Sequence, residues 1–396
     1  MSILDRAKEV TGWAAVLGRV VVKSEMLGHP KPEGLAATAR VLASGKAGVS
    51  AILRIRAANE GDQTAFVFEG HRRTFRDVDR RVDLLATGLR RRGVRPRDSV
   101  ALVLHNRPEF FELEGAMARL GASAVSVSWR STPAELAYLF RHSGARAVFF
   151  EHELAPHVEA ALAECSALTR ERLFPVGGFV PGFTEYESVL ALRPDRDLDS
   201  NEGAVVIYTS GTTGKPKGAV RDFGIGQALG FVAFMERVPM KRGDVHLCVC
   251  PLYHSTGLGF AGMALMVGGT VVIERDFNPE RFLKLVERER VTTTALVPTM
   301  LHRLMGLDPA TLASAQTGTL RTIYCGGAQL PGPLAERALD QFGPVLYNFY
   351  GATETGLVTV ATPEDLRALP GTIGKALHGV SIRLLDEQGA EVARGE

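Results

Sequence analysis

One stretch of the sequence carries residue types that suit the binding of a polyphosphate. Residues 204–218 read AVVIYTSGTTGKPKG, so an apolar run passes directly into a loop rich in glycine, hydroxyl groups and lysine. Glycines let backbone N–H groups approach a ligand, hydroxyls donate hydrogen bonds and lysines add charge. The loop is not a P-loop, because Pro216 stands where that motif needs Ser or Thr. The candidate phosphate-binding residues are Thr209, Ser210, Gly211, Thr212, Thr213, Gly214 and Lys215.

The elements around this loop predict an α/β fold. Short apolar runs alternate with runs of helical spacing, a pattern typical of parallel sheets covered by helices. In such sheets ligands bind beyond the carboxyl ends of strands, which is where the loop lies. The predicted helices include Pro108–Leu120, Thr132–His142, Phe277–Arg290 and Pro331–Phe342. The predicted strands include Ser99–Leu104, Ser123–Ser128, Ala145–Phe150, Ala204–Tyr208, Val245–Cys250, Thr270–Ile273, Thr293–Val297, Leu320–Tyr324 and Val345–Tyr347.

The same pattern predicts the domain organisation. We expect two parallel-sheet subdomains, over about 49–175 and 203–350, joined by a Pro/Gly-rich connector. Val380–Leu385 looks like a strand and is followed by the turn Asp386–Gly389. A β-rich, barrel-like third subdomain is therefore expected to begin within 370–396.

Residues 1–48 are expected to form an amphipathic helix and a linker. Apolar residues recur on one helical face, and GHPKPEG at 28–34 breaks the helix. The helix either packs on the body of the protein or contacts a membrane surface. The apolar run within it is too short to span a bilayer.

Composition excludes several classes of function. The chain has 396 residues and a formal net charge of +2, without the clustered basic face that nucleic-acid binding needs. Its four cysteines are too few and too scattered for a disulfide framework, and the C-x-C pair Cys248 and Cys250 lies in an apolar, core-like run. A reducing compartment, and hence the cytoplasm, is expected.

Four segments together resemble the adenylate-forming enzymes, which include acyl-CoA synthetases, peptide-synthetase adenylation domains and luciferases. TSGTTGKPKG is similar to the phosphate-binding signature of that family. It is followed, in the family's order, by PLYHSTG at 251–257, NFYGATET at 348–355 and GTIGK at 371–375. The resemblance covers roughly residues 50–396. It implies that a carboxylate attacks the α-phosphate of ATP and that a thiol, usually of CoA, then displaces AMP.

The resemblance assigns roles that agree with the chemistry of the residues. Lys215 and its loop would hold the β- and γ-phosphates, Thr353 would touch the α-phosphate and Glu354 would hold Mg²⁺. Tyr350 offers an aromatic face for adenine. The remaining candidate nucleotide-binding residues are Gly326, Gly327, Ala328, Asn348 and Gly351.

The segment PLYHSTG indicates which class of acid the protein would bind. Adenylation domains for amino acids carry an Asp in this segment to pair with the amino group, and none is present here. The resemblance places His254 beside the carboxylate, although a purely structural His254 is the alternative. Gly257, Gly259 and Gly262 lie in a helix rich in Leu, Met and Val that could open an apolar tunnel or form ordinary core. An apolar pocket suggests a medium- or long-chain fatty acid, and an aryl or other acid is the alternative.

The end of the sequence departs from the family. The chain stops at Glu396, whereas the family continues to a ribose-binding Asp, a hinge and a small C-terminal domain with a catalytic Lys. We therefore expect the large N-terminal part alone, with weak or absent turnover. A non-catalytic protein that binds nucleotide or acyl-adenylate, and a scaffold that contacts membranes, remain alternatives. Acyl length, a carrier protein as acceptor and the oligomeric state stay open.

Overall fold

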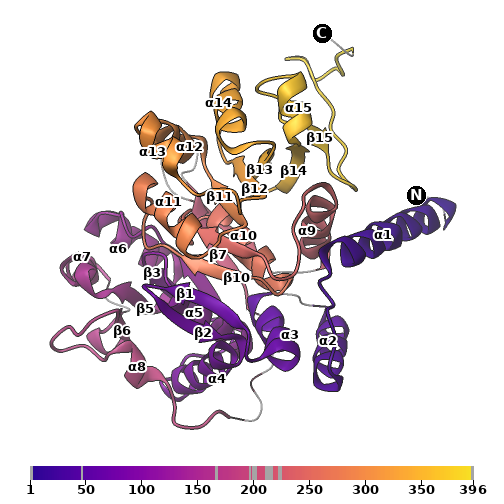
Figure 1. Ribbon diagram of the computed structural model, residues 1–396. Coiled ribbons are helices and arrows are strands. Elements are labelled where there is room, and N and C mark those ends of the chain that lie inside the picture. The colour runs from indigo at the N-terminus through magenta and orange to yellow at the C-terminus, as the bar shows by residue number, and fades with distance from the viewer. Residues whose placement is uncertain are drawn as a thin grey trace.

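The computed structural model describes residues 3–45, 48–165, 168–195, 198, 203–209, 217–221 and 225–393. Within these residues the strands form two sheets, with helices on their faces (Figure 1). The predicted α/β class with parallel-dominated sheets is confirmed.

The smaller sheet has six strands, in the order β6-β5-β3-β4-β7-β8, and only β8 runs antiparallel to its neighbour. Its strands are β3 (Ser99–Val103), β4 (Ser123–Ser126), β5 (Ala145–Glu151), β6 (Leu173–Val176), β7 (Val205–Thr209) and β8 (Lys217–Arg221).

The larger sheet has nine strands, in the order β15-β14-β13-β12-β11-β9-β10-β1-β2, with a parallel centre and antiparallel edges. Its strands are β1 (Thr64–Phe68), β2 (His71–Thr74), β9 (Val245–Cys248), β10 (Thr270–Ile273), β11 (Thr293–Leu296), β12 (Thr322–Gly326), β13 (Leu346–Ala352), β14 (Gly356–Ala361) and β15 (Lys375–Ala376).

The two sheets exchange strands across the boundary expected near residues 175–203. β1 comes from the first part of the chain but pairs with β10 of the larger sheet, Phe66 opposite Val271. β7 comes after the connector but pairs with β4 of the smaller sheet, Val206 opposite Val125. A single cut in the chain therefore does not separate the strands of the two sheets.

Helices form layers on both sides of each sheet. One core lies between the sheets and contains side chains from both, such as Phe66 of β1 and Leu102 of β3. The helices packed in it are α3 (Val49–Glu60), α4 (Phe75–Arg91), α5 (Pro108–Leu120) and α10 (Ser255–Met266). The outer face of the smaller sheet is covered by α6 (Pro133–Ser143) and α7 (Ala155–Leu162). The outer face of the larger sheet is covered by α11 (Pro279–Arg288), α12 (Pro298–Met305) and α14 (Gly332–Phe342). The helix α2 (Pro32–Ser44) lies in the stretch expected to be a linker. Short helices form at α8 (Tyr186–Val189), α13 (Pro309–Ser314) and α15 (Pro363–Ala368).

The predicted helix starts agree with the observed caps. The Thr132 hydroxyl accepts a hydrogen bond from the backbone N–H of Glu135, while the Glu135 carboxylate accepts one from the backbone N–H of Thr132. This capping box, with Pro133 at the first helical turn, fixes where α6 begins.

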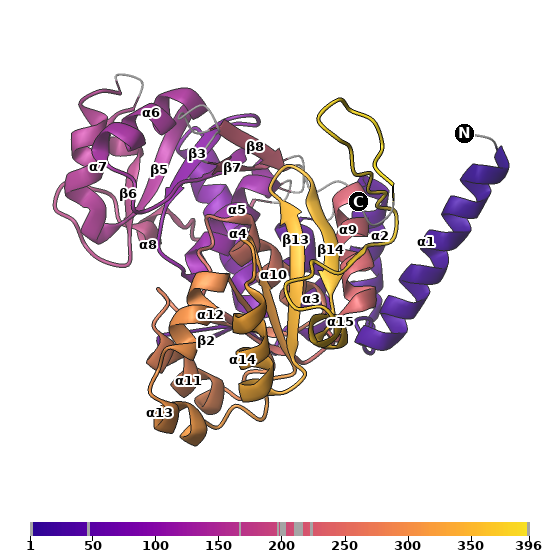
Figure 2. The same ribbon diagram turned by 90° about the horizontal axis from the view of Figure 1, so that it is seen from above.

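The N-terminal helix α1 (Ile3–Ser24) packs against α9 (Ile225–Arg237), as Figure 2 shows. Val16 and Val20 of α1 are buried among residues of α9 and α10. The Arg19 guanidinium donates to the Glu236 carboxylate, with a shortest N–O distance of 2.6 Å. The helix thus packs on the body, but Ala14 and Leu17, which belong to the apolar face predicted to do so, are exposed. None of the described helices is both long and apolar enough to cross a membrane.

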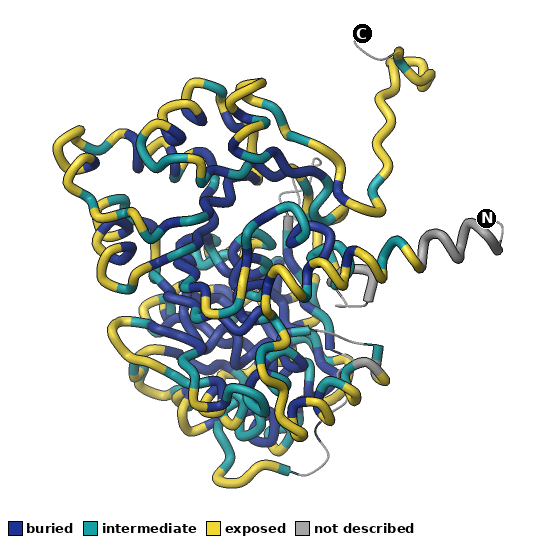
Figure 3. The backbone as a smooth tube through the Cα atoms, turned by 45° about the vertical axis from the view of Figure 1, so that its right-hand side comes forward, coloured by how far each residue is buried: buried dark blue, intermediate teal, exposed yellow. Residues whose placement is uncertain are grey.

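The expected strand Val380–Leu385 is wrong. The structure has only an isolated bridge between Leu385 and Glu391, closed by a turn in which the Gly389 N–H donates to the Asp386 carbonyl at 3.0 Å. This stretch is largely exposed and leaves the body of the protein (Figure 3), so its apolar side chains have no sheet to pack on. No closed barrel occurs in the described part of the chain.

Candidate active site

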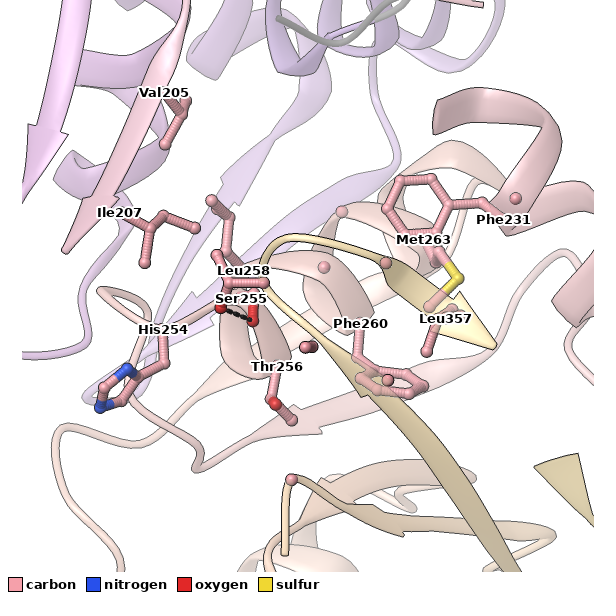
Figure 4. A pocket seen from close by; sticks show the side chains of 18 of the residues that line it. Val205, Ile207, Phe231, His254, Ser255, Thr256, Leu258, Phe260, Met263 and Leu357 are labelled. Carbon is pink, nitrogen blue, oxygen red and sulfur yellow. Dashed lines mark hydrogen bonds between the residues drawn. The ribbon is translucent and has the colours of Figure 1, made fainter. Parts of the chain in front are cut away.

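A pocket of about 980 Å³ lies where both sheets present strand ends and loops. Figure 4 shows His254, Ser255 and Thr256 at one end of it and Phe231, Met263 and Leu357 at the other. Its walls thus combine a polar end with an apolar recess. Of the predicted site residues, the pocket is lined by His254, Gly327, Gly351, Thr353 and Glu354.

The polar end is built from two turns that contact each other. His254 caps the N-terminus of α10, and its backbone N–H donates to the Pro251 carbonyl at 3.1 Å. Ser255, the next residue, lies 3.3 Å from Thr353 between the two hydroxyl oxygens. The turn after β9 and the turn between β13 and β14 are therefore linked at the site.

The His254 ring borders the pocket and is accessible to solvent. Partial burial lowers its pKa below the ordinary value of 6.5, and the positive charge of Arg130 lowers it further. The imidazole is therefore neutral at pH 7 and can donate one N–H and accept one hydrogen bond. This suits a group that orients a carboxylate without forming an ion pair with it.

Thr353 and Glu354 lie on the tight turn between β13 and β14. The Thr355 hydroxyl accepts from the Ala352 N–H at 3.1 Å and closes the turn. Gly351 is required there, because a Cβ at this position would lie 2.2 Å from the Gly356 carbonyl oxygen. The turn leaves Glu354 exposed at the pocket. A single exposed carboxylate fits Mg²⁺, which takes one or two protein carboxylates together with phosphate oxygens. No group of three potential metal-ligating His, Cys, Asp or Glu residues occurs among the described residues.

The two glycines at the end of β12, Gly326 and Gly327, have different roles. Gly326 is buried, and a Cβ there would lie 2.4 Å from the Phe349 carbonyl oxygen, so strand packing requires glycine. Gly327 has a φ of +80° and lines the pocket. Ala328 is exposed but is not part of the pocket wall.

Two other predicted nucleotide contacts lie beside the pocket wall. The side-chain amide of buried Asn348 donates to the Thr372 carbonyl at 2.8 Å, so this donor holds the chain after α15. Tyr350 is 52% exposed and presents its ring to solvent. It does not line the pocket, and stacking of its ring on adenine stays a prediction.

The apolar recess lies between α9 and α10. A Cβ added at Gly230 of α9 or at Gly262 of α10 would have no neighbouring atom within 4 Å. Both residues line the pocket. Phe231, Met263 and Met266 form the apolar wall around them. The predicted apolar tunnel therefore has a counterpart in the structure, and Gly257 serves packing, since a Cβ there would lie 2.4 Å from the Pro251 carbonyl oxygen.

The loop predicted to bind phosphate is only partly described. The predicted contacts Ser210, Gly211, Thr212, Thr213, Gly214 and Lys215 fall outside the described residues, as does the side chain of Thr209. Lys217, which was expected with Lys215 to add charge to this loop, lies at the start of β8 and lines the pocket.

Cys248 and Cys250 are buried, as predicted for the core. All four are free and buried, and burial raises the pKa of Cys250 to about 12. Such thiols are unreactive and serve packing.

Comparison with known proteins adds to this geometry. A model of the family described as AMP-binding enzyme matches residues 53–396. A feruloyl-CoA synthase from Amycolatopsis sp is 33% identical over 343 residues, which are 86% of this chain and 67% of that protein. A fatty acid–[acyl-carrier-protein] ligase, ScoC, from Streptomyces coeruleorubidus is 29% identical over 347 residues, which are 86% of this chain and 65% of that protein. The chain thus spans about two thirds of the length of these relatives.

A solved structure shares the fold over a similar extent. The N-terminal domain of FACL13 from Mycobacterium tuberculosis aligns with a TM-score of 0.74 at 23% identity. The match covers 87% of this chain and 86% of that one. The two chains thus have the same fold over most of their lengths.

Proposed function

Because the chain belongs to the AMP-binding enzyme family, we propose that it activates a carboxylic acid with ATP and passes the acyl group to CoA. The observation that supports this best is the shared pocket of His254, Gly327, Thr353 and Glu354, which opens into an apolar recess. A nucleotide and an apolar acid would meet where these two parts join.

The proposed reaction has two balanced steps. A carboxylate oxygen attacks the α-phosphorus of ATP, the bond to the bridging oxygen of the β-phosphate breaks, and pyrophosphate leaves. The CoA thiol then attacks the acyl carbon, loses its proton to solvent, and AMP leaves with one oxygen of the original acid. Both first-step reactants are anionic, so cations and N–H donors must be placed where charge develops.

The residues of this chain would divide that work. Lys215, with Thr209, Ser210, Gly211, Thr212, Thr213 and Gly214, would hold the terminal phosphates, and Lys217 would add charge at the same wall. Thr353 would donate to the α-phosphate, while the neutral His254 would orient the carboxylate. Glu354 would hold Mg²⁺, which supplies charge neutralisation on the phosphates when bound.

The proposed substrate is a medium- or long-chain fatty acid. Glu354 is the only carboxylate among the described residues that line the pocket, and we assign it to the metal, so those residues offer a substrate amino group no second carboxylate to pair with. The recess is apolar and has room at Gly230 and Gly262. The relatives include ligases named for an aromatic acid and for a fatty acid, so an aryl acid is the alternative within the same chemistry.

The test is mass-spectrometric detection of acyl-AMP and acyl-CoA. The chain is incubated with MgATP, CoA and a mixture of acids from acetate to palmitate, with benzoate and ferulate added. Acyl products of fatty acids support the proposal, and products of the aromatic acids alone would replace the fatty acid by an aryl acid. If ATP binds and no acyl product forms from any acid, even after a complementary C-terminal domain of the family is supplied, a non-catalytic nucleotide-binding role replaces the enzyme.

We place the protein in the cytoplasm, because its four cysteines are free and buried, as suits a reducing compartment. Fractionation of cells that express the chain would test this location.

A further inference from the structure

Asn106 lies between β3 and α5, behind the wall of the pocket rather than in it. It is 3% exposed. Its side-chain amide donates to the carbonyl oxygens of Cys250 and Glu274, both at 3.1 Å. Its side-chain oxygen accepts from the backbone N–H of Leu252 at 2.8 Å. The amide therefore makes three hydrogen bonds, all to backbone groups.

These partners place Asn106 at a junction of the two sheets. Asn106 follows a strand of the smaller sheet, whereas Cys250 and Leu252 follow β9 and Glu274 follows β10 of the larger sheet. One side chain thus joins three strand ends. It also brackets Pro251, because it binds the residues immediately before and after it.

The bracketed Pro251 controls the turn that carries His254. The His254 N–H donates to the Pro251 carbonyl at 3.1 Å, and His254 is the N-cap of α10. Moving Pro251 would therefore move the start of α10 and the imidazole with it. Cys250 and Pro251 line the pocket themselves, so the same amide also shapes the pocket wall.

The base of this junction is held by charge. The neighbouring Arg107 donates to the carboxylates of Glu109 at 2.8 Å and Glu151 at 2.7 Å, and all three side chains are buried. A buried ion-pair network of this kind resists displacement, since breaking one pair leaves an uncompensated charge. Asn106 therefore links the turn to a part of the structure that these ion pairs hold in place.

We propose that Asn106 is a positioning residue that sets the His254 turn against the acid substrate. The role needs an amide, because the site demands two donors and one acceptor. Asp at this position would keep the bond to Leu252 but direct oxygen at two carbonyls, and Ala would remove all three bonds. The inference rests on the proposed function, in which His254 orients the carboxylate.

The test is calorimetric binding of two probes, ATP and the stable adenylate mimic 5′-O-(N-decanoylsulfamoyl)adenosine, to the full chain. The variants are Asn106→Asp, Asn106→Ala, His254→Ala and the double variant Asn106→Asp/His254→Ala. The control is Thr87→Ala, at a residue of α4 that does not line the pocket. This change removes a buried hydroxyl, which accepts a hydrogen bond from the Asp195 N–H at 2.9 Å. Thermal unfolding is measured for each, so that loss of fold is separated from loss of position.

We expect Asn106→Asp to weaken binding of the decanoyl probe by about tenfold or more, because a positioned group is displaced. The affinity for ATP should change little, and the control variant should bind both probes nearly as the wild type does. In the His254→Ala background the same change should add no more than about a twofold loss, because coupled residues are not additive. Full additivity in the double variant, or equal weakening of ATP and the decanoyl probe, would overturn the role of Asn106. Failure of the wild-type chain to bind the decanoyl probe would instead overturn the proposed function, and the positioning role with it. If Asn106→Ala does not fold, Asn106→Asp, which keeps the side-chain volume, decides the outcome.

Discussion

Glu354 and His254 both border the pocket, but their side chains differ in charge. Glu354 is a charged, exposed carboxylate on a tight turn, whereas His254 is a ring that its surroundings keep neutral. The first suits a cation bound to phosphates, and the second suits orientation of an anion. Each role leads to a separate prediction.

Glu354→Gln should lower acid-dependent formation of acyl-AMP by about 100-fold or more, the scale on which loss of one electrostatic contact to a transition state acts. The melting temperature should stay unchanged, because the side chain is exposed. The matched control is Glu364→Gln, an exposed carboxylate of α15 that does not line the pocket. Equal activity in the two variants would remove Glu354 from the proposed site.

His254 predicts a specific pH dependence. Because its pKa is lowered from 6.5, the ring stays neutral until the pH falls below that value. Protonation would then pair the ring with the substrate carboxylate and weaken that nucleophile, so kcat/KM for the acid should be flat above pH 6.5 and fall below it. His254→Asn should abolish this inflection. Arg130→Gln should shift it toward higher pH, since the Arg130 charge lowers the pKa, and an inflection that both variants leave unmoved would contradict the role.

Residue types and motif order were enough to predict that His254, Thr353 and Glu354 meet, although they lie about a hundred residues apart. The side-chain amide of Asn348 donates to the Thr372 carbonyl, and its contact with a nucleotide stays a prediction. A sequence does not show which side of a strand end faces a ligand. Asn106 gave no signal either, because its partners are backbone atoms brought close only by the fold of two sheets.

At the scale of elements, the proposed function makes α10 the helix that would determine how much of an acid the pocket can hold. It supplies His254 at its N-cap and Gly262, Met263 and Met266 along the recess. The helix thus fixes the distance between the reacting carboxylate and the apolar wall. A change of side-chain size along it should alter selectivity more than chemistry.

Gly262→Leu should shift the preferred fatty acid to a shorter chain. The open space at a Gly262 Cβ would be filled by the new side chain, and long acids should lose about tenfold or more in kcat/KM relative to short ones. The shift is measured as the ratio of thioester formed from octanoate and palmitate in competition. Gly18→Leu, at a glycine of α1 that also has open space but lies outside the pocket, should leave the ratio unchanged. A ratio that Gly262→Leu leaves unaltered would place the acyl chain elsewhere.

Elements with local signals were predictable and those that depend on distant pairing were not. Helices α5 and α6 both begin at a proline, and a proline at the start of a helical pattern is visible in the sequence. β1 was missed, since it owes its place to β10, about two hundred residues away. β2 was missed although it pairs with β1 through the local turn at Glu69 and Gly70. Val380–Leu385 has strand-like composition, yet without a partner sheet it forms only one bridge.

At the scale of the whole molecule, the strand exchange makes the pocket a joint product of both sheets. Val205 and Ile207 come from the smaller sheet, while Cys250 and Gly351 come with the larger one. The alternation of elements predicted the α/β class and the presence of two sheets. It could not predict the exchange, because alternation is the same whichever sheet a strand joins.

The N-terminal helix gives a prediction at this scale. Val20 is buried against α9, whereas Leu17 is 44% exposed. Val20→Asp should release α1 and raise the rate of proteolysis within residues 3–24 by about tenfold or more, and Leu17→Asp should raise it little. Equal cleavage of both variants would mean that the buried face does not hold the helix. Flotation of the wild-type chain with anionic liposomes, lost in Leu17→Asp, would support the predicted membrane contact of the exposed face.

The most direct test of the central claim is the fate of oxygen from the acid. The chain is incubated with decanoate labelled with ¹⁸O in both carboxylate positions, MgATP and CoA, and the products are weighed by mass spectrometry. Attack on the α-phosphorus predicts one ¹⁸O in AMP and none in pyrophosphate. Label in inorganic phosphate, or unlabelled AMP formed together with decanoyl-CoA, would contradict activation through an acyl-adenylate.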